Sequence, residues 1–139
     1  MDRANRLGMA IALLSALHLA AYFLFKESPV WFNVSLFVAA RVERFTGALP
    51  GLLVAFAFTT AGLAIAAAIA EQESRIAAGI FLLISLFEFW ARLIELEYVV
   101  ESGTPLSGTL ILGLAVSLAA LLIALLALWV TARRRWSAD

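Results

Sequence analysis

The chain alternates long apolar runs with short polar interruptions. Four runs approach or exceed the roughly 20 apolar residues that a helix needs to cross the hydrocarbon core of a bilayer. They occupy residues 7–25, 49–70, 76–100 and 109–131. The polar interruption at Glu71–Arg75 is short, and a short connection makes the helices on either side antiparallel neighbours. The pattern therefore predicts an all-α fold, an up-down bundle of four transmembrane helices.

A mixed segment, residues 29–46, lies between the first two runs. Ser28-Pro29 is typical of a helix start, because a capping hydroxyl precedes a proline in the first turn. Thr46-Gly47 suits a helix stop. The apolar part of the segment, residues 30–40, is too short to span a bilayer. We expect an extra amphipathic helix at the outer interface, with a fifth crossing as the alternative.

Small residues recur every three or four positions along the second run. They are Gly51, Ala55, Thr59, Gly62 and Ala66, and a weaker series in the fourth run comprises Gly113, Ser117 and Ala120. In lipid, such faces let helix backbones approach closely. The series predict close helix packing within one bundle.

Composition supports a membrane protein. Of 139 residues, 64% are hydrophobic and only 14% are charged, whereas soluble domains are about half apolar and a quarter charged. The length predicts a single integral membrane domain over residues 1–139. The first run is longer than the apolar core of a signal peptide, about 7–15 residues, and no small-residue cleavage site follows it. We interpret it as a retained helix.

The arginines predict the orientation. Arg3, Arg6, Arg75 and Arg133–Arg135 all fall on one side of a four-crossing chain. Because cytoplasmic loops are enriched in Lys and Arg, that side should be the cytoplasm. We expect a multi-pass protein of a bacterial cell (inner) membrane with both termini cytoplasmic. A fifth crossing would move Arg133–Arg135 to the opposite side, against this bias.

The third run carries the candidate site. Ser85, Glu88, Arg92 and Glu95 are spaced by three, four and three residues, so they share one face of a helix. Glu88 lies about 20 Å along the helix from Arg75, past the middle of the bilayer. Charges at this depth are expensive, and we expect them to face the bundle or a watery vestibule. Glu88 can reach Arg92, and Arg92 can reach Glu95.

Two interpretations of this stripe stay open. It is either an ion cluster that fixes helix packing, or the lining of an outer-half pocket for a small polar, cationic or lipid-like ligand, with proton linkage through Glu88 as a further option. The first apolar run carries a second polar stripe with fewer charged residues, which consists of Ser15, His18 and Tyr22. This stripe either bonds across helices or relays protons toward Glu88.

Further residues complete the candidate set. Arg41, Arg44 and Glu97 are possible partners of the cluster on the outer side. The chain has one histidine and no cysteine, which argues against a metal site and against disulfides. No cofactor is predicted. The formal net charge is zero, so no basic field indicates nucleic-acid binding.

The layout resembles that of the small bacterial four-helix DoxX-like membrane proteins. The similar features are Arg41 and Gly47 before the second run, the Glu71–Arg75 turn, Arg92 late in the third run and Gly103-x-Pro105 before the fourth. The resemblance implies a four-helix membrane fold and carries no functional assignment.

The sequence is compatible with two hypotheses for the function of the protein. No nucleophile elbow, phosphate loop or metalloprotease motif is present, so no catalytic residue is predicted and a non-enzymatic role is favoured. The first hypothesis is a membrane subunit or scaffold that acts through helix packing, as a homo-oligomer or an accessory of a larger complex. The alternative is a binding or transport protein with the outer-half pocket. The expected partners are the lipid bilayer and membrane subunits.

Overall fold

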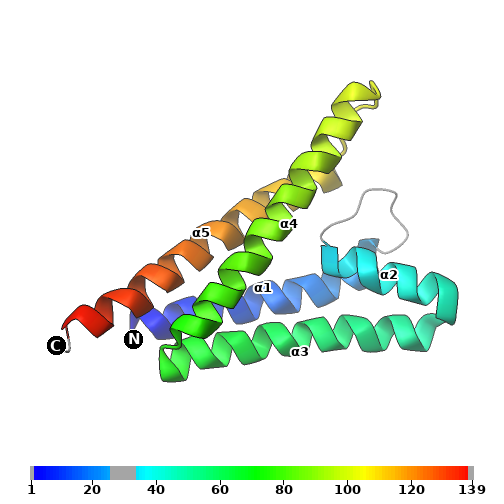
Figure 1. Cartoon of the computed structure of the whole chain (residues 1–139). Helices are drawn as coiled ribbons and strands as arrows, with labels where there is room; N and C mark the ends of the chain where they lie inside the picture. The colour runs from blue at the N-terminus through cyan, green and yellow to red at the C-terminus, as the bar shows by residue number, and fades with distance from the viewer. Residues whose placement is uncertain (1, 26–33, 138–139) are drawn as a thin grey trace.

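The computed structural model describes residues 2–25 and 34–137, and the regular structure in these ranges is entirely α-helical, as the apolar pattern predicts. The elements are α1 (Arg3–Phe25), α2 (Val34–Thr46), α3 (Ala48–Gln72), α4 (Arg75–Glu101) and α5 (Gly108–Ser137). Figure 1 shows them in chain order.

Local backbone chemistry sets the helix ends near the predicted positions. α3 ends at Gln72, and Glu73, which caps it, has a left-handed φ of 51°. α4 begins after Ser74, whose hydroxyl accepts a hydrogen bond of 3.1 Å from the N–H of Ala77. α2 ends at Thr46 because Gly47 takes a φ of 105°, which favours glycine. The predicted start of this helix at Ser28-Pro29 lies outside the described residues.

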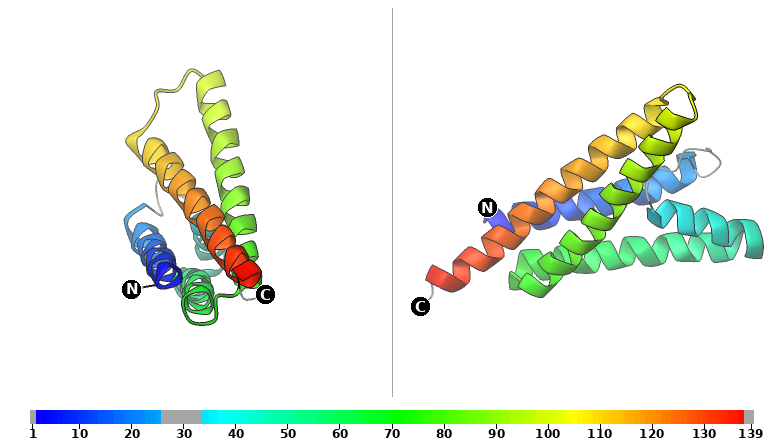
Figure 2. Two further views of the ribbon diagram at one scale, coloured as in Figure 1. Left: turned by 90° about the vertical axis from the view of Figure 1, so that its left-hand side faces the viewer. Right: turned by 45° about the horizontal axis from the view of Figure 1, so that its top comes forward.

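The long helices form two packed pairs. α1 lies along α3, and α4 lies along α5. The pairs meet where the N-terminus, the α3–α4 turn and the C-terminus gather, and they diverge toward the other end (Figures 1 and 2). The expectation that α3 and α4 pack side by side is therefore wrong, since they make few contacts and diverge from their connection in Figures 1 and 2. A turn of two residues joins two helices without forcing them to stay parallel.

Where the pairs meet, an apolar core holds them together. Its buried members come from four helices: Ile11, Ala66, Ile69, Ala77, Ala78 and Ala127. Most of them are alanines, so the helices approach closely and bury little side-chain volume. A second, smaller cluster joins Ala39 of α2 to Ala55 of α3.

Glycines let α1 approach α3. A Cβ atom on Gly8 would lie 2.6 Å from the Cβ of Ala70, and one on Gly62 would collide with the hydroxyl of Ser15. The small-residue face of α3 is thus used within the chain, as predicted. The weaker series on α5 is also buried, at Gly113, Ser117 and Ala120.

Three helices in the described ranges are long and apolar enough to cross a membrane. They are Ala48–Gln72, Arg75–Glu101 and Leu110–Arg133. They are compatible with a multi-pass membrane protein. A crossing by α1, which would be the fourth, stays a prediction.

α2 runs back along the first half of α3, to which it is joined at Gly47 (Figures 1 and 2). Close packing is possible there because a Cβ on Gly51 would lie 2.5 Å from the Cβ of Glu43. The placement of α2 at a membrane interface also stays a prediction.

Candidate functional site

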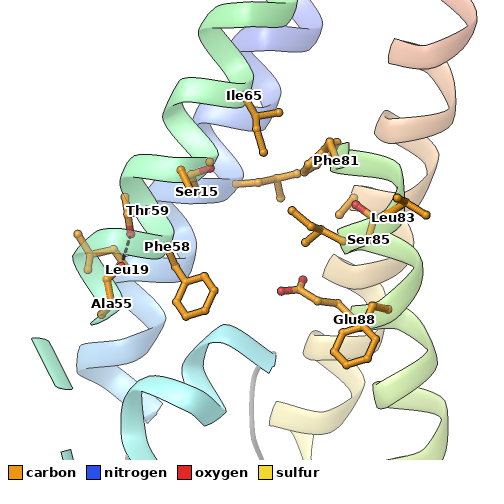
Figure 3. A pocket seen from close by; sticks show the side chains of 16 residues that line it. Ser15, Leu19, Ala55, Phe58, Thr59, Ile65, Phe81, Leu83, Ser85 and Glu88 are labelled. Atoms are coloured by element: carbon orange, nitrogen blue, oxygen red, sulfur yellow. Dashed lines mark hydrogen bonds between the residues drawn. The ribbon is translucent and has the colours of Figure 1, made fainter. Parts of the chain in front are cut away.

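The divergence of the helix pairs leaves a cavity of about 400 Å³ between α1 and α3 on one side and α4 on the other (Figure 3). Most of its walls are apolar, and the larger contributors are Leu14, Phe58, Ile65, Phe81, Ile84 and Phe87. Phe58 and Phe87 are about half-exposed, at 46% and 54%. The cavity therefore has an apolar mouth at the molecular surface.

Two polar side chains enter the cavity from α4. Ser85 and Glu88 lie one turn apart on the same face, and both are buried, with 2% and 8% of their surface exposed. In Figure 3 the carboxylate of Glu88 points away from α4 toward Phe58 on the opposite wall. Arg92, one turn further, is also buried. The stripe thus lies in the interior and not on the apolar outer faces of α4.

Of the two ion pairs that the stripe allows, the described side chains show the one between Arg92 and Glu95. The Nη1 atom of Arg92 lies 2.5 Å from the Oε2 atom of Glu95, and this ion pair is largely buried. Among the described side chains, Glu88 forms no such ion pair, although Arg92 attracts it electrostatically. Arg92 pairs toward the end of α4, where Glu95 is partly exposed. Glu88 is left facing the cavity.

The hydroxyl of Ser85 is unusual. It is buried, and no hydrogen-bond partner is found for it within residues 2–25 and 34–137. Native proteins satisfy most buried polar atoms, since an unpaired one destabilises the fold by about 1–3 kcal/mol. The sequence places Ser85 on the charged stripe, but helical spacing does not show whether its hydroxyl has a partner.

Two more hydroxyls line the cavity from the opposite wall. Ser15 donates to the carbonyl of Ile11 at 2.9 Å, and Thr59 donates to the carbonyl of Ala55 at 3.0 Å. Their hydrogens are used within their own helices. Thr59 was predicted only as a packing residue. A site role for Thr59 could have been suspected because Thr59 is a polar residue within an apolar run.

The other predicted site residues do not line this cavity. Glu97 is exposed on α4, and Arg41 and Arg44 are exposed on α2, which packs on α3 and α1. Their roles as outer-side partners stay predictions. The side chains of His18 and Tyr22 lie outside the described part of the structure, so the proton relay toward Glu88 also stays a prediction.

Metal ligation has no support in the part of the chain that is described, where no group of three or more His, Asp or Glu side chains could hold an ion. Comparison with known proteins finds no matching family model, no matching curated protein and no matching solved structure. The resemblance to DoxX-like proteins is therefore unsupported by a family match. The function has to be argued from the cavity itself.

Proposed function

We propose that this small membrane protein binds an amphiphilic molecule in the cavity between α3 and α4. The observation that carries this proposal is the pair Ser85 and Glu88, which are buried in an apolar cavity without a hydrogen-bond or ion-pair partner among the described residues. A bound polar group would satisfy both. The apolar walls would hold the remainder of the molecule.

The cavity has the character of a ligand site. Ligand pockets usually occupy about 300–1,000 Å³ and combine mostly apolar walls with a few polar groups that orient the ligand. A volume of about 400 Å³ suits a small amphiphile. Phe58 and Phe87 line the cavity and are about half-exposed, so they belong to its apolar mouth, and many other large apolar side chains are exposed on the helices. Such a mouth favours entry sideways from the bilayer.

The subunit or scaffold hypothesis has less support. It was based on the small size, on the absence of soluble domains and catalytic motifs, and on the small-residue faces. Of these faces, Gly62 on α3 contacts α1, and Ala120 and Ala124 on α5 are buried within the chain. These faces are therefore not free to dock a second copy. The exposed apolar side chains of the long helices are suited equally to lipid and to another subunit. Assembly as a homo-oligomer or within a larger membrane complex stays a prediction.

Photoaffinity labelling in vesicles tests the proposal. The probes are octyl chains that carry a diazirine and end in an amine, a hydroxyl or a carboxylate. We expect at least one probe to label the cavity walls saturably. Ala61 lines the cavity and Ala67 does not, although both are exposed alanines of α3. Ala61→Trp should therefore abolish saturable labelling, and the matched variant Ala67→Trp should keep it. Labelling by all three probes that is spread over the lipid-facing surface without saturation would reject the proposal.

A further inference from the structure

The polar side chains that line the cavity can accept hydrogen bonds from a ligand, and none of them is restricted to donating. Thr59 and Ser15 direct their hydrogens to carbonyls of their own helices, so what remains for a ligand is their lone pairs. An ionised Glu88 can only accept. Ser85 can accept as well as donate, and its hydroxyl has no partner within the described residues.

No described residue of the lining supplies a fixed donor. None of the lining side chains is an amide, an indole, a phenol, a guanidinium or an ammonium. Arg92, the nearest cation on α4, is paired with Glu95. A ligand group that only donates hydrogen bonds is therefore the best complement to these walls.

The charges near the cavity restrict the class of ligand group further. The guanidinium of Arg92 forms its ion pair with the carboxylate of Glu95, so an ionised Glu88 has only the attraction of Arg92 without direct contact. A carboxylate at this depth is stabilised by a nearby cation, because burial removes the water that would otherwise solvate it. A monovalent cation would neutralise the cavity.

We propose that the head group selected by this cavity is an organic ammonium, a protonated primary amine carried by an apolar body. This inference rests on the proposed function. An ammonium has three N–H donors. One binds the carboxylate of Glu88, a second binds the hydroxyl oxygen of Ser85 one turn away, and the third is available to the α3 wall, where Thr59 lies. An alcohol offers one donor and no charge, and an anionic head is repelled by Glu88.

Isothermal titration calorimetry on the protein in zwitterionic lipid nanodiscs tests the inference, with empty nanodiscs as the blank. The probes are octylamine, octanol and octanoate, which share a chain and differ in the head. We expect octylamine to bind one-to-one and at least about tenfold more tightly than octanol, because hydrogen bonds to a charged group are stronger. Octanoate should not bind measurably.

Variants test whether the charge of Glu88 and the hydroxyl of Ser85 contribute to the binding of octylamine. Glu88→Gln should weaken octylamine at least about tenfold and leave octanol unchanged, while Ser85→Ala should weaken octylamine by a few-fold. Glu97→Gln is the matched control, an exposed carboxylate of α4 outside the cavity, and should bind as the wild type does. Equal affinity of wild-type protein for octylamine and octanol would overturn the ammonium inference and leave the proposed function standing. No binding of any of the three probes would overturn both.

Discussion

Ser85, Glu88 and Arg92 share one face of α4, yet each has a different environment. Arg92 is satisfied by Glu95, Glu88 faces a cavity, and the Ser85 hydroxyl has no partner among the described residues. Their common face follows from the helical repeat, and their burial follows from the expense of polar groups in lipid. The pairing could not be predicted, since both Glu88 and Glu95 lie within reach of Arg92 along the helix.

Single substitutions should reveal this difference as unequal changes in stability. Ser85→Ala removes an unsatisfied hydroxyl, so unfolding should occur at an unchanged or higher temperature. Glu95→Gln leaves a buried guanidinium without its counter-charge and should lower the free energy of unfolding by about 2 kcal/mol, less than a fully buried pair because Glu95 is partly exposed. Circular dichroism during heating in mild detergent measures both. A marked loss of stability in Ser85→Ala would show that its hydroxyl has a structural partner.

At the scale of the helices, the apolar runs predicted the elements well. The turn at Glu71–Arg75 and the stop at Thr46-Gly47 have recognisable local chemistry, and both are where they were expected. The small-residue face of α3 was also recognisable. Its partner was not, because a periodic face shows that a neighbour comes close without showing which helix it is. α1 occupies that face at Gly62 and Ala66, α2 occupies it at Gly51 and Ala55, and α4 diverges from α3 (Figure 1).

Glycine substitutions test this packing. Gly8→Ala would place a methyl group 2.6 Å from the Cβ of Ala70 and 2.8 Å from the carbonyl oxygen of Ala66, so it should lower the free energy of unfolding by about 1–3 kcal/mol. Gly79→Ala is the matched control, because nothing lies within 4 Å of the added atom on α4. This variant should be stabilised by about 0.5–1 kcal/mol through helix propensity. Comparable effects of the two substitutions in thermal unfolding would argue against close packing of α1 on α3.

At the scale of the whole molecule, the two helix pairs are closed at one end and open at the other. The ends of the chain and the α3–α4 turn gather at the closed end (Figure 1). Arg3, Arg75 and Arg133 belong to these segments, which is the distribution that the predicted orientation requires. The cavity exists because the pairs diverge. Sequence periodicity describes single helices, so it does not predict the angle between pairs or the space that the angle creates.

Cysteine labelling tests the topology, because the natural chain contains no cysteine. Single substitutions are placed at Gln72, the last residue of α3 beside the α3–α4 connection, and at Thr104, in the α4–α5 connection. In intact cells a membrane-impermeant maleimide should modify Thr104→Cys, whereas Gln72→Cys should react only after the membrane is permeabilised. Modification of Gln72→Cys in intact cells would reverse the proposed orientation.

The most direct test of ligand binding at Glu88 is thermal unfolding of wild-type protein and Glu88→Gln, each alone and with octylamine, octanol or octanoate. We predict that Glu88→Gln alone unfolds no earlier than the wild type, since its carboxylate has no ion-pair partner among the described residues to lose. At least one compound, at about ten times its dissociation constant, should raise the unfolding temperature of the wild type by about 2–5 °C and leave Glu88→Gln unchanged. If Glu88→Gln alone unfolds several degrees earlier and no compound distinguishes the two proteins, Glu88 supports helix packing and the cavity is not a binding site.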